Sequence, residues 1–229
     1  MNIEKIVDLN HTISKDFFTN SNVFEVILNL KNYIVKLGKS LDKSNYIEKE
    51  ENIWISKSAV IDNTVHIDAP CIIDDNAEIR HCAYIRAGVI IGKNCIIGNS
   101  CELKNSIIFD NAQIPHFNYV GDSIIGYKSH MGAGVIATNL KSDKSNIIIK
   151  DNDTVIETGL KKMGSIIGNF VEIGCNSTLF PGTIIYPNTT IYPLTRVRGI
   201  IPENSIVKNE KEIVKKEEKK WKNYLEQME

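Results

Sequence analysis

Aliphatic residues recur at every sixth position through the middle of the chain. The first run contains nine successive Ile or Leu residues at this spacing: Ile55, Ile61, Ile67, Ile73, Ile79, Ile85, Ile91, Ile97 and Leu103. Two five-residue steps shift the phase, giving Ile108, Ile114, Val120 and then Ile125, Met131, Ala137, and a last run contains Ile167, Ile173, Leu179, Ile185, Ile191 and Val197. This period fits neither a helix nor a lone strand, whose side chains repeat every 3.6 and 2 residues. It predicts a short strand and a turn, repeated as one flat side of a prism.

The residue two positions before each aliphatic one is usually small. This second series runs Ala59, Val65, Cys71, Ala77, Ala83, Val89, Cys95, Cys101. Gly often follows the aliphatic residue, as in Ile91-Gly92 and Ile97-Gly98. Three hexads make one triangular coil of 18 residues, and stacked coils bury the aliphatic column and pair their strands in parallel. We therefore expect an all-β fold, a parallel β-helix over residues 51–207.

The two ends of the chain and one internal stretch depart from this pattern. Residues 1–50 hold a helical repeat that predicts a helical N-terminal appendage: Phe24, Ile27, Leu30, Ile34, Leu37 and Leu41. Residues 208–229 are highly charged, with Trp221, Tyr224, Leu225 and Met228 on one stripe, which predicts a C-terminal helix. The hexads lapse between 138 and 166, and such a long excursion is typical of a functional loop.

Composition narrows the function classes. The 229 residues carry 27 Lys and Arg against 28 Asp and Glu, so a nucleic-acid grip based on excess positive charge is not expected. No apolar run approaches the roughly 20 residues that span a bilayer, and the N-terminus lacks the apolar core of a signal peptide. We therefore expect a cytoplasmic protein that binds no membrane.

The cysteine and histidine patterns favour no metal site. Three of the five cysteines, Cys71, Cys95 and Cys101, fall on the small interior column and are most simply core residues. The histidines are spaced unlike the zinc ligands of hexapeptide-repeat carbonic anhydrases, because no two of them are five residues apart.

The segment 114–122, IPHFNYVGD, carries a family resemblance. Together with residues before and after it, it resembles the left-handed β-helix domain of the bifunctional glucosamine-1-phosphate acetyltransferase / N-acetylglucosamine-1-phosphate uridyltransferase family. The matching positions are Arg86, Lys104, His116, Tyr119, Gly121, Asp122, Gly126, Gly132, Ala133, Gly134 and Asn139. The resemblance covers residues 53–207, and its later loop looks closest to archaeal sugar-1-phosphate nucleotidylyltransferases with an acetyltransferase tail.

The resemblance implies a fold, an assembly and an activity. The fold would be a left-handed β-helix that forms a trimer, with sites between neighbouring prisms. The activity would be acetyl-CoA-dependent N-acetylation of a hexosamine 1-phosphate, first of all glucosamine 1-phosphate, in the synthesis of UDP-N-acetylhexosamine precursors of the cell envelope. The uridyltransferase half has no counterpart, since residues 1–50 contain a single glycine, Gly38, and no Gly-rich phosphate loop. A separate nucleotidyltransferase chain is therefore a possible partner.

The motif residues have chemistry that suits this reaction. His116 is the candidate general base, because a neutral imidazole can accept a proton from the attacking amine. Gly132, Ala133 and Gly134 leave their backbone open to the coenzyme, and Asn118, Tyr119 and Asn139 can hydrogen-bond sugar hydroxyls or the amine.

Cations complete the expected site. Arg86 and Lys104 differ by 18 residues, one full coil, and could clamp a phosphate from one face. The family has a Lys where this chain has Ser145, so Lys144, or else Lys141, is expected to replace it.

Two other functions remain open from the sequence. One is acyl transfer to a different sugar phosphate or sugar nucleotide. The other is a non-catalytic trimeric partner of a sugar nucleotidyltransferase, and homology could give such a chain a nucleotidyltransferase or pyrophosphorylase label. The second reading predicts loss of the polar site residues, and their joint presence in this chain disfavours it.

Overall fold

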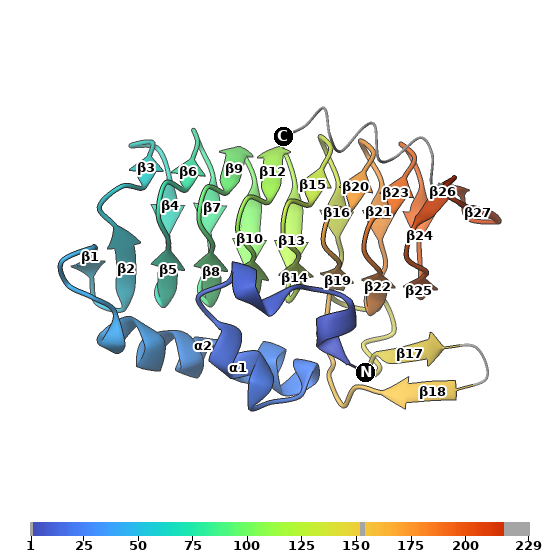
Figure 1. Ribbon diagram of the computed structural model, residues 1–229, viewed down its shortest axis with the longest axis horizontal. Coiled ribbons are helices and arrows are strands. Elements are labelled where there is room, and N and C mark those ends of the chain that lie inside the picture. The colour runs from blue at the N-terminus through green and yellow to red at the C-terminus, as the bar shows by residue number, and fades with distance from the viewer. Residues whose placement is uncertain (1, 152–153, 218–229) are drawn as a thin grey trace.

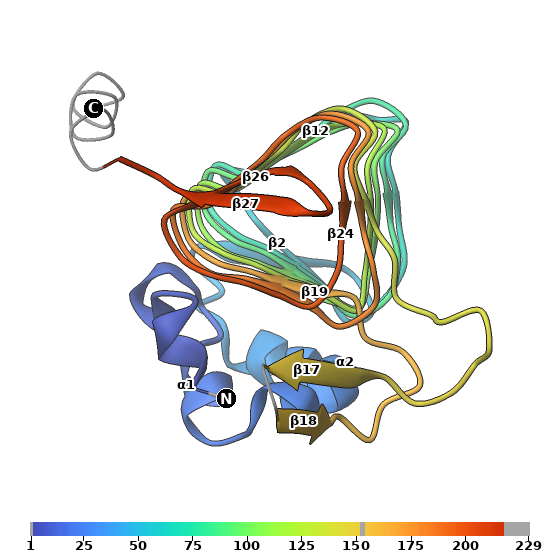
Figure 2. The same ribbon diagram turned by 90° about the vertical axis from the view of Figure 1, so that its right-hand side faces the viewer.

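Each hexad of the repeat forms one side of a triangular coil, and successive coils stack into a solenoid (Figure 1; Figure 2). The computed structural model describes residues 2–151 and 154–217. The predicted aliphatic column is in register from coil to coil, since Ile55 pairs with Ile73, Ile73 with Ile91, and Ile91 with Ile108. The pairing of the strands between coils is parallel, as the repeat predicts.

Three sheets form the sides of the prism. The first, which we call the covered sheet, contains β1 (Tyr46–Glu50), β2 (Ile53–Ser56), β5 (Cys71–Ile73), β8 (Val89–Ile91), β11 (Ser106–Ile108), β14 (Ile124–Ile125), β19 (Ser165–Ile167), β22 (Thr183–Ile185) and β25 (Ile200–Ile201). The seven-stranded sheet contains β4 (His66–Ile67), β7 (Tyr84–Ile85), β10 (Glu102–Lys104), β13 (Tyr119–Gly121), β16 (Ile136–Ala137), β21 (Thr178–Leu179) and β24 (Arg196–Val197). The open sheet contains β3 (Val60–Ile61), β6 (Glu78–Ile79), β9 (Ile96–Asn99), β12 (Gln113–His116), β15 (His130–Met131), β20 (Glu172–Ile173), β23 (Thr190–Ile191), β26 (Ser205–Asn209) and β27 (Glu212–Lys215).

The solenoid is left-handed. In Figure 2 the C-terminal coils face the viewer, and the chain passes clockwise from the open sheet to the seven-stranded sheet and then to the covered sheet. A chain that turns clockwise as it approaches the viewer follows a left-handed helix. This handedness is the opposite of the usual crossover between parallel strands, so the general rule alone would have predicted it wrongly.

The inside of the prism is a continuous aliphatic core. The hexad residues and the small residues two positions before them form one buried cluster along its length, including Cys71, Cys95 and Cys101. The thiols of these three cysteines are inside the core, where burial raises their pKa. They are therefore packing residues, as the sequence predicts.

The N-terminal segment packs on the outside of the covered sheet and makes a second core. It contains η1 (Ile3–Lys5), η2 (Leu9–His11), α1 (Lys15–Thr19) and α2 (Val23–Ser40), and α2 is the predicted amphipathic helix. Figure 2 shows these helices beneath the covered sheet. Outward-facing isoleucines of the sheet join the buried side chains of the helices: Ile72, Ile90, Ile107, Ile124, Ile166 and Ile184. The N-terminal segment is therefore an integral layer, although its helical pattern alone predicts only an appendage.

The solenoid is interrupted once. The chain leaves it after β16, in the region where the hexads lapse, and returns at β19. Between them, the hairpin of β17 (Ile148–Asp151) and β18 (Thr154–Glu157) lies on the same side of the prism as the N-terminal helices, but further along its axis, toward the C-terminal coils (Figure 1; Figure 2). Ile147, Ile149, Leu160 and Met163 of this excursion join the second core. The excursion is thus anchored to the same face that the helices cover.

The C-terminal flank differs from the expectation of a helix over 208–229. Residues 205–215 form β26 and β27, an antiparallel hairpin that closes the end of the open sheet. Val207 is buried against the solenoid core, so the edge of the last coil is covered by strand pairing. The predicted stripe of Trp221, Tyr224, Leu225 and Met228 lies outside the described residues. Within residues 2–151 and 154–217, no helix is long and apolar enough to cross a membrane.

Candidate active site

His116 lies at the corner between the open sheet and the seven-stranded sheet. It is the last residue of β12, and its side chain is exposed. Its backbone is held on both sides: the N–H donates to Oδ1 of Asn118 (3.0 Å), and the carbonyl accepts from the N–H of Gly134 on the next coil (3.0 Å). A fixed backbone with an exposed imidazole suits a proton acceptor.

Asn118 supports this corner from inside the solenoid. Its side chain is buried, and its amide nitrogen donates to the carbonyls of Gly132 (2.7 Å) and Val135 (3.4 Å). The expectation that Asn118 contacts the acceptor disagrees with this geometry, because a buried side chain bonded to backbone cannot reach a ligand. Its observed partners make it a brace between two coils.

The Gly132-Ala133-Gly134 segment is the same corner one coil further on. The N–H of Gly132 donates to the carbonyl of Ile173 (2.7 Å), and that of Gly134 to His116, so both are occupied. The N–H of Ala133 donates no hydrogen bond within the described part of the chain, and Ala133 is partly exposed. It is therefore the donor that a ligand beside His116 could use.

The two glycines also allow the next coil to stack closely. A Cβ on Gly132 would lie 2.8 Å from the backbone nitrogen of Cys175. Gly134 has a φ of +73°, in the left-handed region that favours glycine. Close stacking therefore accounts for glycine at both positions, and the segment offers a ligand one backbone donor rather than three.

A cluster of polar side chains lies at the far end of β13, with Asp122 at its centre. The Asp122 carboxylate accepts hydrogen bonds from Nζ of Lys104 (3.0 and 3.2 Å), from Nδ2 of Asn105 (2.9 Å) and from Nδ2 of Asn139. Asp122 is 5% exposed, so this carboxylate is nearly closed off from solvent. We call Lys104, Asn105, Asp122 and Asn139 the Asp122 cluster.

Gly121 makes room for two side chains of the predicted site. A Cβ at this position would lie 2.6 Å from Oη of Tyr119 and 2.7 Å from Nδ2 of Asn139. Burial raises the pKa of Tyr119, and the negative charges of Asp122 and Glu102 add to the increase. The Tyr119 hydroxyl is thus protonated at neutral pH and can donate a hydrogen bond to a ligand.

Arg86 and Lys104 lie on adjacent coils, as their spacing predicts, but each already has a carboxylate partner. The backbone N–H of Arg86 donates to the backbone carbonyl of Leu103 (2.8 Å), which sets the two strands side by side. Nη1 of Arg86 is 2.8 Å from Oε1 of Glu102, while Lys104 is bound to Asp122. The Arg86 side chain is 39% exposed and that of Lys104 is 19% exposed, so Arg86 is the more accessible cation.

Lys144 is not brought into this group. It lies in an exposed turn of the excursion, with a φ of +56°, and its side chain has no hydrogen bond to the described residues. Lys141 is bonded to Ser145 and paired with Asp143 in the same turn (3.7 Å). The structure therefore joins Arg86, Lys104, Tyr119 and Asn139 on one face, with His116 at its start.

The sequence assigned no role to Glu102, Asn105 or Asp122, which the structure brings together with the candidate residues. All lie beside predicted residues, in the segments CELKN and YVGD. The 17-residue offset between Asn105 and Asp122 is one coil at the phase shift, and this offset is a signal that could have linked them.

Among the described residues, no group of three or more His, Cys, Asp or Glu side chains is arranged to hold a metal ion.

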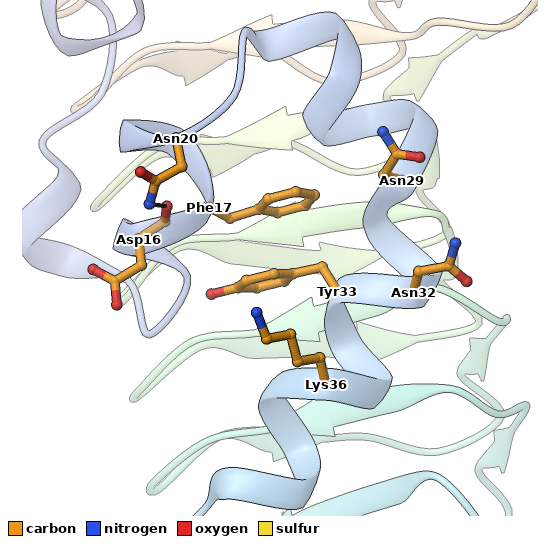
Figure 3. Close-up of a pocket in the computed structure, with 7 residues that line it drawn as sticks. All are labelled: Asp16, Phe17, Asn20, Asn29, Asn32, Tyr33 and Lys36. Atoms are coloured by element: carbon orange, nitrogen blue, oxygen red, sulfur yellow. Dashed lines mark hydrogen bonds between the residues drawn. The ribbon is translucent and has the colours of Figure 1, made fainter.

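A pocket of about 430 Å³ opens between α1 and α2, away from the predicted residues (Figure 3). Its floor is the stacked pair of Phe17 and Tyr33, with ring centroids 4.0 Å apart. These rings bridge the two helices, which is a packing role.

The family model described as the GMPPB C-terminal domain matches residues 67–201. The chain belongs to this family. The matched region begins in the first coil and ends at β25, and it contains all of the predicted site residues. The match therefore covers the repeat and the excursion together.

Curated relatives carry the name that the motif suggested. The chain is 32% identical over 118 residues to the bifunctional protein GlmU of Methanococcus aeolicus, a match covering 52% of this chain and 28% of that protein. It is 37% identical over 83 residues to a bifunctional sugar-1-phosphate nucleotidylyltransferase/acetyltransferase of Sulfurisphaera tokodaii, covering 36% of this chain and 21% of that protein. The chain thus spans less than a third of the length of these relatives.

Solved structures with a related arrangement are more distant. A variant of AntD, an N-acyltransferase from Bacillus cereus in complex with dTDP and coenzyme A, is 18% identical with a TM-score of 0.42, covering 80% of this chain and 97% of that one. The acetyltransferase domain of PglB from Neisseria gonorrhoeae is 16% identical with a TM-score of 0.27, covering 56% of this chain and 49% of that one.

Proposed function

We propose that this chain transfers an acetyl group from acetyl-CoA to the amine of a hexosamine 1-phosphate, with glucosamine 1-phosphate as the first acceptor to test. The observation that carries the proposal is the corner at His116. There an exposed imidazole lies one coil from the unoccupied N–H of Ala133, and a polar face begins at Tyr119. The names of the relatives support both the acetyl transfer and the sugar phosphate.

The proposed reaction follows from these groups. The neutral amine attacks the thioester carbonyl carbon, and the new C–N bond gives a tetrahedral intermediate, whose collapse breaks the C–S bond. His116 accepts the proton from the amine nitrogen and returns it to the coenzyme thiolate. The Ala133 N–H donates to the oxygen of the tetrahedral intermediate, where a preorganised backbone donor stabilises negative charge.

The acceptor would lie along β13. Tyr119 and Asn139 would bond the sugar hydroxyls, and the open side of the Arg86 guanidinium would bind the phosphate. Lys104, held by its ion pair with Asp122, would add a second positive charge near the phosphate. The site would be completed between neighbouring prisms of a trimer. The N-terminal helices cover one sheet of the prism, so the open sheet and the seven-stranded sheet are left for such contacts, which supports this arrangement.

A thiol-release assay with acetyl-CoA tests the proposal. The acceptors are glucosamine 1-phosphate, galactosamine 1-phosphate, unphosphorylated glucosamine and UDP-glucosamine. We expect thiol release with an amino-sugar 1-phosphate and almost none with glucosamine. Release with UDP-glucosamine alone would identify a nucleotide-sugar acyltransferase, and no release with any acceptor would favour the non-catalytic partner.

A further inference from the structure

The cluster around Asp122 joins three separate parts of the chain. Lys104 and Asn105 come from the coil before Asp122, and Asn139 from the start of the excursion. The backbone takes part as well, since the N–H of Asp122 donates to the carbonyl of Lys104 (2.8 Å) and its carbonyl accepts from Gly164 (2.9 Å). Asp122 therefore holds both ends of the excursion, residues 139 and 164, against the solenoid.

The cluster also reaches the N-terminal segment. Nδ2 of Asn105 donates both to Asp122 and to the backbone carbonyl of Ile27 in α2 (3.0 Å). On the other side, the N–H of Met163 donates to the carbonyl of Asn139 (3.0 Å), and Met163 is buried in the second core. Both routes connect the covered sheet and its helices to the acceptor face.

Each donor in the cluster would be left unsatisfied or mobile without the carboxylate. An ionised carboxylate offers about four acceptor sites, and here it is used by three side chains. A flexible lysine held at two oxygen atoms of a nearly buried partner has a fixed direction, which a solvated lysine lacks.

We propose that Asp122 is the positioning residue of the acceptor site: its carboxylate fixes Lys104 and Asn139 toward the acceptor and, through Asn105, fastens helix α2 to that site. This inference rests on the proposed function. In it Asp122 touches no reacting atom, and it acts through the residues that it holds. The N-terminal helices are then part of the support of the site and not only a cover for the sheet.

Asp122→Asn is the variant that tests this inference. Asp122 has a φ of +48°, and Asn is one of the few residues that adopt this conformation readily, so the backbone is preserved. Asn lacks the charge and one acceptor oxygen, so Lys104 and Asn139 cannot both be held. We expect the KM for glucosamine 1-phosphate to rise roughly 10- to 150-fold, as for loss of a charge-assisted contact. The KM for acetyl-CoA should change less than about twofold.

Asp74→Asn is the matched control. Asp74 is also a buried carboxylate, and it also joins separate parts of the chain, since it accepts from the hydroxyl of Tyr46 in β1. It lies at the corner after β5, away from the acceptor face. We expect this variant to lower the melting temperature without changing either KM.

A second readout does not depend on turnover. The ionisation of Tyr119 is measured as the difference in ultraviolet titration between each protein and its Tyr119→Phe derivative. Because the charge of Asp122 contributes to the raised pKa of Tyr119, Asp122→Asn should lower that pKa. Asp74→Asn should leave it unchanged.

The outcomes separate the two proposals. Wild-type protein that acetylates none of the acceptors overturns the proposed function, whatever Asp122 does. Active wild-type protein with an unchanged acceptor KM in folded Asp122→Asn overturns the positioning role. An equal rise in both KM values would also overturn it, because it would indicate a general structural effect.

Discussion

Nη1 of Arg86 lies 2.8 Å from Oε1 of Glu102, which belongs to the next coil of the solenoid. The two side chains are 39% and 38% exposed, and an ion pair this open contributes little to folding stability. Its effect is on geometry: the carboxylate directs one edge of the guanidinium along the sheet and leaves its other N–H groups for a second anion. The proposed phosphate binding by Arg86 would use these N–H groups, with Glu102 holding the guanidinium in place.

Arg86→Ala should therefore raise the KM for the phosphorylated amino sugar. The loss of one charge-assisted contact costs about 1.5–3 kcal/mol, or roughly 10- to 150-fold. Steady-state kinetics with acetyl-CoA and glucosamine 1-phosphate measures the effect, and the KM for acetyl-CoA serves as the internal control. A parallel loss of activity toward unphosphorylated glucosamine would show that Arg86 is structural or belongs to the coenzyme site.

His116→Ala should lower kcat by about 10²–10⁴-fold, the usual contribution of general base catalysis. The side chain is exposed and the corner is held through backbone atoms, so the variant should fold and melt like the wild type. Circular dichroism checks the fold and the thiol-release assay checks the rate. A folded variant with wild-type kcat would rule out His116 as the base.

Gly38→Ala should destabilise the protein although alanine favours helices. Replacement of glycine within a helix normally gains about 1 kcal/mol. Here a Cβ would lie 2.1 Å from the ring of Trp54, so the indole or the helix must move, and such overpacking costs about 1–3 kcal/mol. Thermal melting measures the balance. Asn32→Ala, at an exposed position of the same helix, is the control and should raise the melting temperature slightly.

Asp110→Asn should stabilise the protein at neutral pH. Burial raises the pKa of Asp110, and the charge of Asp74 adds to the increase. The native state therefore binds this proton more tightly than the unfolded state, so ionised Asp110 costs stability above the raised pKa. The cost disappears as the pH falls below the ordinary value of 3.8.

Asn retains the oxygen that accepts the Lys93 N–H (2.9 Å), so the substitution removes only the charge. The melting temperatures of the two proteins, measured from pH 7.5 downward, should converge in acid. A difference that stays constant across this range would mean that the charge of Asp110 is not responsible.

The repeat predicts the inside of the solenoid because each hexad residue repeats the same packing problem. The layer that covers the outside of one sheet was harder to predict, although the sequence contains a signal for it. In one sheet the inward isoleucine is preceded by another, as at Ile90-Ile91 and Ile107-Ile108, and the first of each pair faces outward into the second core. Two consecutive aliphatic residues in a strand need cover on both faces, which predicts a layer over that sheet.

The site was predicted in part for a similar reason. His116, Tyr119 and Asn139 became candidates because they belong to a specific motif, whereas the burial of Asn118 depends on how the corner turns. Lys104 and Asp122 are 18 residues apart, whereas the strand register here is 17 residues, and the phase shift that creates this register says nothing about which side chains then meet. The prediction of a C-terminal helix was wrong for residues 208–215. These residues pair as strands at the end of the open sheet, and their charged composition did not indicate this pairing.

The layer on the covered sheet changes how the coils depend on one another. In a bare solenoid each coil contacts only its neighbours, so opening can begin at either end and progress coil by coil. Here the helices and the excursion pack as one cluster against strands from Trp54 to Ile184, nearly the full length of the prism. They act as a splint, and the coils beneath them should exchange their amide hydrogens as a single cooperative unit. The last coil packs against this cluster through Ile200, which is only partly buried, so fraying should begin at that coil.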